Sequence, residues 1–396
     1  MFEHLAPYAG DPIFRIGDMF RQDQRQNKVD LTVGLYYDGK GQIPILDSIH
    51  QAELKRAQHP ETRQYLPMEG LPSYRSAVQK LLFGTECAAL NEGRIVTMQS
   101  VGGTGALRIG GELLHLASPN SEIWISNPGW DNHHAIFEGA GLKTHTYPYY
   151  DSVNGVLLFD EMKQTFQTIP AGSIVLLHPC CHNPTGADLS SAQWEEIADI
   201  IVERKLIPFL DIAYQGFSNG LDEDAFAIRL LASRNIPMLV ANSFSKNFSF
   251  YAERCGALSV VCQNTLEADR VLGQIKLLVR RIYSNPPLHG ARMISDVLND
   301  PELFAMWDRE VNEMRTRIRN IRQKAYDILK AQAPHFDSSF IIRQNGMFSY
   351  TGLSLPQIEK LRADYGVYFI DSGRISVPGL NEDNVTYFAE SVSKVV

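Results

Sequence analysis

Short apolar runs alternate with helical patterns through the middle of the chain. The apolar runs, rich in β-branched residues, occupy residues 94–98, 122–126, 173–178, 207–213, 238–244 and 256–262. Between them, residues 104–117, 190–204 and 224–233 have the apolar spacing of helices. Strands that alternate with helices predict a mainly parallel sheet covered by helices on both faces.

The last two apolar runs are joined differently from the others. The loop between them is too short for the crossover helix that connects parallel strands. We therefore expect the run at 256–262 to lie antiparallel to the run at 238–244.

The C-terminal part of the chain has another organisation. Residues 301–332 predict one long helix, rich in Arg and Glu, that bridges two lobes. Beyond it, short strands at 346–350, 367–370 and 374–377 stand among helices, which is typical of a smaller α+β domain.

The segment before residue 45 has no core of its own, so we expect it to join the C-terminal lobe. The predicted division is an N-terminal arm at 1–13, a small domain at 14–44 plus 314–396, and a large domain at 45–313.

Composition narrows the class of protein. The chain has 396 residues, 44% of them hydrophobic, which is enough for a large core and a satellite domain. Its net charge of −8 argues against nucleic-acid binding, which usually needs a basic surface. No apolar run reaches the roughly 18 residues that span a bilayer, and the first residues lack the pattern of a secretion signal.

The five cysteines are sparse, which does not suit a disulfide framework and predicts a reducing, cytoplasmic location. Cys180, Cys181 and His182 are adjacent and suggest metal ligands. No second ligand motif accompanies them, so we predict no metal.

The most informative segment is NSFSKNFSFYAERCG at 242–256, which follows an apolar run. Lys246 at such a strand end either reaches water or serves as an amine that bonds a carbonyl. Ser243, Ser245 and Arg254 around it suit a phosphate. A carbonyl-bonding lysine beside a phosphate site is what pyridoxal phosphate requires. The alternative is an exposed lysine in a polar turn.

Other motifs fall at predicted strand ends, where parallel sheets bind ligands. The glycine-rich turn at 102–105 lets backbone N–H groups approach a phosphate at a helix N-terminus, although it also suits a simple tight turn. Asn183, in HNPTG, is placed to donate to a phenolic oxygen or a carboxylate, but Asn-Pro and Thr-Gly also form turns.

Asp211 lies inside an apolar run, so it should be buried, and a buried carboxylate needs a cationic partner or several donors. A protonated pyridine nitrogen would serve, and Tyr214 nearby would reach the phenolic oxygen of the same ring. A structural salt bridge is the alternative. Arg374, after a strand and a glycine, suits a substrate carboxylate, although a surface arginine is also consistent.

Together these motifs resemble the class I pyridoxal-phosphate aminotransferases of the aspartate and aromatic subgroup, most of all the bacterial aromatic-amino-acid enzymes. The resemblance spans nearly the whole chain and rests on DPIF at 11, LPMEGL at 66, CCHNPTG at 180, DIAYQGF at 211, SNPP at 284 and NGMFSYTGL at 345. It implies the PLP-dependent transferase fold of type I, with a seven-stranded, mainly parallel sheet and a smaller α+β domain.

The resemblance also implies an activity. The chain would move an amino group between tyrosine, phenylalanine or aspartate and 2-oxoglutarate, by a ping-pong mechanism in which the coenzyme alternates between its pyridoxal and pyridoxamine forms. It would act as a homodimer with shared active sites.

The resemblance assigns roles around the coenzyme. Lys246 would bind it covalently and move protons, Asp211 would pair with the ring nitrogen, and Tyr214 would bond the phenolic oxygen. Further coenzyme contacts would come from Asn183, from Trp130 stacked on the ring, from His133 behind Asp211, and from the phosphate-binding residues Gly103, Thr104, Ser243, Ser245, Arg254 and, from the second subunit, Tyr65.

The resemblance assigns substrate contacts as well. Arg374 would bind the α-carboxylate, aided by Asn183, Trp130 and the backbone of Gly34. Arg280 of the second subunit would bind a side-chain carboxylate.

The residues expected at the mouth of the site are mixed. Leu35, Tyr37 and Ile43 follow the aromatic type, whereas Gln64, Thr104 and Asn285 follow the aspartate type. Burying an aromatic side chain gains roughly 1.5–3 kcal/mol, but leaving Arg280 desolvated and unpaired would cost at least as much. We therefore expect dual specificity, with Arg280 swinging out to water when an aromatic substrate binds.

Three other functions compete with this interpretation. Residues 243–246 also match S-x-x-K of penicillin-binding hydrolases, but the K-T-G element is missing and that motif belongs at a helix start. A non-catalytic binding protein would have no need of Lys246. Decarboxylation or elimination would use the same coenzyme contacts, and the two-arginine pocket favours transamination over them.

Overall fold

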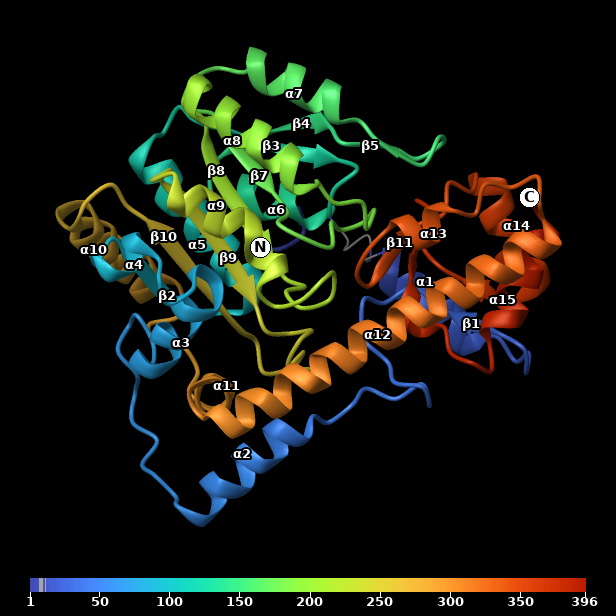
Figure 1. Ribbon diagram of the computed structural model, residues 1–396, viewed down its shortest axis with the longest axis horizontal. Helices are drawn as coiled ribbons and strands as arrows, with labels where there is room; N and C mark the ends of the chain where they lie inside the picture. The colour runs from blue at the N-terminus through green and yellow to red at the C-terminus, as the bar shows by residue number, and fades with distance from the viewer. Residues whose placement is uncertain (7–9, 11) are drawn as a thin grey trace.

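A seven-stranded sheet forms the centre of the larger part of the molecule in the computed structural model, which describes residues 1–6, 10 and 12–396 (Figure 1). Its strand order is β2-β10-β9-β8-β7-β3-β4. The strands are β2 Ile95–Val101, β3 Glu122–Asn127, β4 Lys143–Pro148, β7 Ile174–Leu177, β8 Ile207–Ile212, β9 Met238–Ser243 and β10 Cys255–Val261. Neighbours pair in parallel except at β10, which is antiparallel to β2 and β9. The predicted sheet and its antiparallel strand are confirmed.

Each predicted apolar run overlaps a strand of the sheet, with bounds that differ by up to three residues. Strand β4 is the member of the sheet that the apolar pattern missed. It lies at the sheet edge and reads KTHTYP, with Tyr147 as its buried residue. An edge strand that faces solvent has no need of an apolar run.

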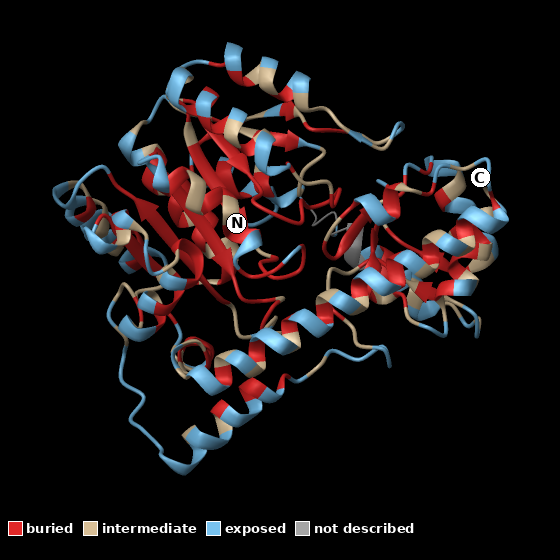
Figure 2. Cartoon of the chain, in the orientation of Figure 1, coloured by how far each residue is buried: buried red, intermediate tan, exposed pale blue. Residues whose placement is uncertain are grey.

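Helices cover both faces of the sheet (Figure 1). The helices of this larger part are α2 Asp47–Gln58, α3 Pro72–Phe83, α4 Ala88–Asn91, α5 Gly102–Ala117, α6 Asn132–Gly139, α7 Phe159–Thr168, α8 Ser191–Arg204, η1 Glu223–Ala225, α9 Phe226–Ser233, α10 Thr265–Ile282 and α11 His289–Asn299, of which α2 packs on α11 and α12 rather than on the sheet. Successive residues of β7 belong to different core clusters, with Leu176 on the side of α5 and Leu177 on the side of α8. The strands are accordingly buried on both faces (Figure 2).

The long predicted helix is present as α12 Pro301–Gln332, which runs from the larger part to a smaller group of elements (Figure 1). That group holds α1 Pro12–Gln22, β1 Val29–Asp30, α13 Phe340–Arg343, β11 Phe348–Tyr350, α14 Leu355–Tyr365, β12 Val367–Tyr368, β13 Arg374–Ser376, η2 Val377–Gly379 and α15 Val385–Ser393. A hairpin of β5 Tyr150–Asp151 and β6 Val156–Leu157 contacts this group, since Gln344 Nε2 donates to Oη of Tyr150 at 2.7 Å.

Strand β1 pairs in parallel with β12, and β11 pairs antiparallel with β13. The N-terminal segment therefore lies with the C-terminal elements. The domain boundaries themselves stay a prediction, and residues 7–9 and 11 of the predicted arm fall outside the described residues.

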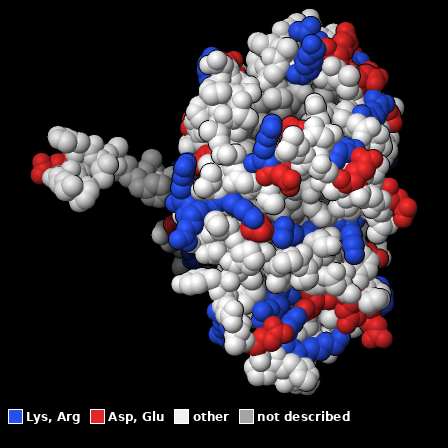
Figure 3. Space-filling view, turned by 90° about the vertical axis from the view of Figure 1, so that its left-hand side faces the viewer, with Lys and Arg blue, Asp and Glu red and all other residues white. Residues whose placement is uncertain are grey.

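The surface carries mixed charge. On the face in Figure 3, acidic and basic side chains are interspersed over a largely uncharged surface. Among the residues that the structure describes, no helix combines the length and apolar character needed to cross a membrane.

Helix α5 packs unusually close to the sheet because Gly110 has no side chain. A Cβ placed there would lie 2.4 Å from Cζ of Phe209 in β8 and 3.2 Å from Cδ1 of Leu258 in β10. The glycine thus fixes the height of α5 above the strands, and with it the position of the N-terminus of the helix at the strand ends.

We predict that Gly110→Ala lowers the free energy of unfolding by about 1–3 kcal/mol, since the added methyl group overpacks the core. The matched control is Gly273→Ala in α10, where a Cβ meets nothing within 4 Å. That substitution should raise the free energy of unfolding by up to about 1 kcal/mol, because alanine favours the helix. Urea unfolding of both variants tests this, and equal effects would contradict the close packing of α5.

Candidate active site

The predicted motifs gather at the carboxyl ends of the parallel strands, the edge at which sheets of this kind bind ligands. Asn183 follows β7, Asp211 lies near the end of β8, and Lys246 follows β9. Trp130 follows β3, and α5 begins directly after β2. Segments far apart in the sequence therefore meet at one edge.

Asp211 is a buried carboxylate, 7% exposed, held by a buried histidine. His133 Nε2 lies 2.9 Å from Oδ2 of Asp211. Burial alone raises the pKa of Asp211, but the hydrogen bond and charge of His133, together with smaller contributions from His178 and Lys246, hold the pKa below its usual value. The carboxylate is therefore ionised at neutral pH and available to a cation.

Lys246 is partly buried and lies 5.1 Å from the ring centroid of Tyr214. Burial, opposed by Asp211 and assisted by Arg254, lowers the pKa of the Lys246 amine to about 8. The uncharged amine, which is the form that attacks a carbonyl, is thus accessible at mildly alkaline pH.

A cradle for an anion forms beside Lys246. The backbone N–H of Gly102 donates to the carbonyl of Arg254 at 2.8 Å, and a Cβ on Gly103 would lie 3.2 Å from Cβ of Ser243. Ser243 Oγ donates to Ser245 Oγ at 3.0 Å, and Arg254 Nη1 donates to the same oxygen at 3.4 Å. A helix N-terminus, two hydroxyls and a guanidinium therefore converge, as a phosphate requires. The glycine turn, expected before the helix, forms its first turn together with Thr104.

Arg374 is buried at the start of β13. Its Nη2 donates to the carbonyl of Thr32 at 2.6 Å, and its guanidinium lies 4.5 Å from the ring centroid of Phe348. The same ring occupies the space beside Gly34, where a Cβ would lie 2.6 Å from it. Burial raises the pKa of Tyr214 well above its usual value, and Arg374, which lies close, opposes the shift.

Asn183 and Trp130 complete this group. Asn183 is buried, and its Oδ1 has no hydrogen-bond partner among the residues that the structure describes. Buried polar atoms usually have a partner, so this amide suits a polar ligand. Trp130 lies edge-on to His133, with ring centroids 5.0 Å apart.

Tyr65 and Arg280 are not brought into this group within one chain. Tyr65 is 94% exposed, and Arg280 is exposed and hydrogen-bonded to Ser284. Their segments adjoin, because Asn285 Nδ2 donates to the carbonyl of Leu66 at 2.7 Å. Both residues therefore stand together on an exposed surface.

Of the residues predicted to set specificity, some lie beside Arg374 and others are exposed on the surface. Leu35 and Tyr37 are partly buried in a segment whose Tyr36 N–H donates to Oη of Tyr251 at 2.7 Å. The segment also supplies the Thr32 carbonyl to Arg374, so it lies across the site. Ile43 and Gln64 are exposed.

Sequence reasoning missed His178, which lies at the end of β7. Its ring stands between His133 and His182, with centroid separations of 5.4 and 4.5 Å. Burial lowers the pKa of His178 to about 4, so its ring is neutral at pH 7. Phe348 and Tyr251 were missed as well. For His178 the available signal was a polar residue that closes an apolar run.

The three suspected metal ligands, Cys180, Cys181 and His182, do not converge on one site. His182 is engaged by Ser126 and Thr185, both at its ring nitrogens. Cys180 and Cys181 instead lie near Asp224, with their possible ligand atoms within 4.8 Å of one another. Burial raises the pKa of the Cys181 thiol to about 12, which keeps it protonated. The prediction of no metal stays a prediction.

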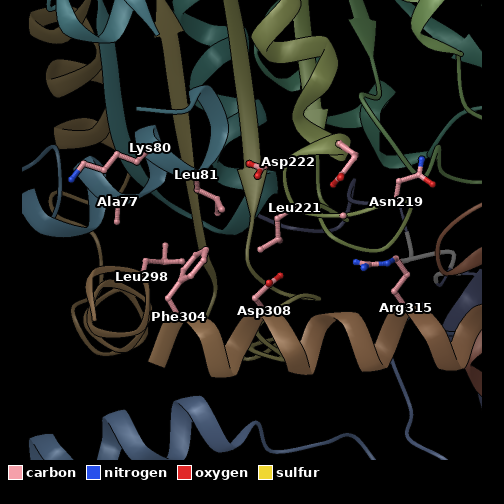
Figure 4. A pocket seen from close by; sticks show the side chains of 12 residues that line it. Ala77, Lys80, Leu81, Asn219, Leu221, Asp222, Leu298, Phe304, Asp308 and Arg315 are labelled. Atoms are coloured by element: carbon pink, nitrogen blue, oxygen red, sulfur yellow. The ribbon is translucent and has the colours of Figure 1, made fainter. Parts of the chain in front are cut away.

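A separate cavity of about 380 Å³ lies between α3, the loop before η1, α11 and α12 (Figure 4). Its lining includes Lys80, Asp222, Asp308 and Arg315 and none of the predicted site residues. Arg315 donates to the Gly216 carbonyl at 2.7 Å. This cavity belongs to the junction of α12 with the larger part, not to the group around Lys246.

Comparison with known proteins yields one family. Residues 26–392 match the family described as aminotransferase class I and II. The chain is 50% identical to a tyrosine aminotransferase of Klebsiella pneumoniae, with all of both chains covered.

Two solved structures are similarly close. One is an aromatic-amino-acid aminotransferase of Burkholderia pseudomallei covalently bound to pyridoxal phosphate, at 44% identity and a TM-score of 0.98, covering 100% of this chain and 99% of the other. The second is an aromatic amino acids aminotransferase of Psychrobacter sp. B6 cocrystallised with aspartic acid, at 46% identity and a TM-score of 0.98, with the same coverage.

The buried His178 predicts a pH dependence of stability. Its pKa falls from the ordinary 6.5 to about 4 on folding, so the unfolded chain binds more protons between these values and stability falls as the pH falls. Lowering the pH from about 7 to about 5 should cost roughly 2 kcal/mol through this residue. Urea unfolding of the wild type and of His178→Gln at both pH values tests this. The variant should lose less stability, and identical losses would contradict the assignment.

Proposed function

The chain belongs to the class I and II aminotransferases, and on this basis we propose that it exchanges an amino group between tyrosine, phenylalanine or aspartate and 2-oxoglutarate. The observation that carries the proposal is the convergence of the Lys246 amine, the Asp211 carboxylate and the Arg374 guanidinium at one end of the sheet. An amine, an anion and a carboxylate-binding cation are the groups that transamination of an amino acid requires.

The cofactor is pyridoxal phosphate, and the residues present fit it. The N-terminus of α5, the hydroxyls of Ser243 and Ser245 and the Arg254 guanidinium together form the donor set that a phosphate needs. The anion cradle at the N-terminus of α5 would hold the phosphate, Asp211 the ring nitrogen, Tyr214 and Asn183 the phenolic oxygen, and Trp130 the ring face. When bound, the coenzyme supplies a carbonyl for the amino group and a ring that withdraws electrons.

Asp211 keeps a positive charge favourable at the ring nitrogen, because His133 holds the carboxylate ionised despite its burial. Lys246 would hold the coenzyme through its amine, and the same amine would take the proton from the substrate Cα. Its pKa of about 8 suits this work, since a general base is most effective when its pKa lies near the working pH.

Arg374 binds the substrate α-carboxylate through the planar fork of its guanidinium. Thr32 and Phe348 hold that guanidinium from two sides. The segment with Leu35 and Tyr37 lies beside it and offers apolar surface to an aromatic side chain.

The working unit is a homodimer in the cytoplasm. Tyr65 and Arg280 are predicted to act on coenzyme phosphate and substrate, yet in one chain they stand exposed on a shared surface. A second copy placed on that surface would receive both side chains in its own site. The five cysteines are free thiols, as a reducing compartment allows.

The position of Ser243 does not favour the hydrolase alternative. Ser243 is the last residue of β9 rather than the start of a helix, and its hydroxyl donates to Ser245. A serine nucleophile needs a base at that hydroxyl instead.

We predict that Lys246→Ala folds and binds pyridoxal phosphate but has no measurable turnover, since the amine that binds the coenzyme and moves the proton is gone. Borohydride reduction followed by mass spectrometry should attach the coenzyme to the wild type and not to the variant. Lys163→Ala is the control, because Lys163 pairs with Glu196 on the surface at 2.8 Å. Retained turnover in Lys246→Ala would falsify the central assignment.

We predict that Arg280→Ala discriminates between the two substrate classes. Aspartate should lose about 100-fold or more in kcat/KM, because its side-chain carboxylate loses a charged partner. Phenylalanine should lose less than about fivefold, since Arg280 would point to water when an aromatic ring is bound. The neighbouring Arg281→Ala is the control and should leave both values unchanged. Similar losses for the two substrates in Arg280→Ala would contradict dual specificity.

A further inference from the structure

Helix α12 carries a charged residue on its apolar stripe. Ile318, Ile321, Ala325 and Leu329 are buried at helical spacing, and Arg322 lies among them, 3% exposed. A buried guanidinium usually has a carboxylate partner. The hydrogen bonds of Arg322 go elsewhere.

Its hydrogen bonds reach α13, the turn that follows it and β11. Nη1 donates to the carbonyl of Ile341 at 2.8 Å and to Oγ of Ser349 at 2.6 Å. Nη2 donates to the carbonyls of Gly346 at 2.8 Å and Phe348 at 2.6 Å. Burial lowers the pKa of Arg322 to about 10, so it remains charged at neutral pH. One rigid fork therefore fixes the backbone on both sides of Phe348.

Phe348 connects β11 with the residues proposed to bind the substrate. Its ring lies 4.5 Å from the guanidinium of Arg374 and 5.8 Å, edge-on, from the ring of Tyr214. Strand β11 also pairs with β13, with Tyr350 opposite Arg374. A shift of β11 would thus move both the aromatic ring under Arg374 and the strand that carries it.

The same helix is tied to the coenzyme side. Trp307 Nε1 donates to the carbonyl of Asn247, the residue after Lys246, at 2.8 Å, and its ring stacks on Phe248 with centroids 4.4 Å apart. Trp307 and Arg322 belong to one unbroken helix, in which that separation corresponds to roughly 22 Å of rise. Helix α12 therefore sets the distance between the loop that carries Lys246 and the strands around Arg374.

We infer that Arg322 is a positioning residue for the substrate α-carboxylate. It touches no substrate and acts by holding β11, and through Phe348 it sets the place of Arg374. The inference rests on the proposed function, in which Arg374 binds that carboxylate.

The test compares Arg322→Lys with the wild-type holoenzyme. Lysine keeps the charge but has one nitrogen, so it cannot serve both pairs of acceptors. The Kd of succinate, a dicarboxylate with no group to react, should rise about tenfold by calorimetry, and the KM of aspartate should rise with it. The kcat should stay within about threefold, and the Kd of pyridoxal phosphate should be unchanged, because the coenzyme cradle lies on other elements.

Arg319→Lys is the matched control. Arg319 lies about one turn earlier on α12 and donates to the Ser218 carbonyl and to Oδ1 of Asn219, on a loop of the larger part. It should leave the Kd of succinate unchanged. Ser349→Ala removes one acceptor of Arg322 and should raise that Kd about threefold, which keeps the test decisive if Arg322→Lys does not fold.

A residue with a merely structural role would lower the free energy of unfolding or the active fraction without moving the Kd of succinate. An unchanged Kd in both Arg322→Lys and Ser349→Ala overturns the inference. Failure of the proposed function is distinguishable, because the wild type would then neither transaminate aspartate nor bind succinate.

Discussion

The ionised carboxylate of Asp211, buried at the end of a central strand, is the constraint on which the arrangement depends. Removing such a charge from water is costly unless hydrogen bonds and opposite charge compensate. His133 supplies the hydrogen bond and Lys246 an opposite charge nearby. Because β8 lies between β7 and β9, the loops after both neighbouring strands begin at the same edge as the carboxylate, and these loops carry Asn183 and Lys246. The central position of β8 in the sheet therefore explains both why Asp211 is buried and why it lies near Lys246.

The antiparallel strand β10 serves the same site. After Lys246 the chain turns back at once instead of crossing over the sheet, so Arg254 returns to the edge that Ser243 has just left. A parallel connection would have carried the chain to the opposite edge before the next strand began. The reversal also sets β10 against β2, and the Gly102 N–H meets the Arg254 carbonyl. Strand direction therefore decides where the anion cradle forms.

The features that could be predicted from the sequence are those set by the local apolar pattern and by the order of the strands along the chain. The sheet, its antiparallel member, the long helix and the gathering of Asp211 and Lys246 follow from apolar runs and from residue types at their ends. Strand β4 was missed because an exposed edge strand has no apolar run. Arg322 lies in a helix rich in Arg and Glu, where composition suggests solvent; its place on the apolar stripe was the signal. The roles of Tyr65 and Arg280 depend on a second chain, and neither the pattern nor one chain can place them.

The proposed site combines groups of opposite charge, and Arg322 stands behind it bonded to carbonyls. An acidic protein of net charge −8 must here bind two anions, a phosphate and a carboxylate. In the proposed site, Arg254 and Arg374 would provide the cations, and Asp211 would provide the anion for a cationic ring. The buried carboxylate of Asp188 lies close enough to interact electrostatically with Arg322, but it accepts hydrogen bonds from the backbone N–H groups of Cys181 and His182. Arg322 is therefore free to direct its donors to the carbonyls of β11, so a strand with no charge of its own is held in place beneath Arg374 by a single guanidinium.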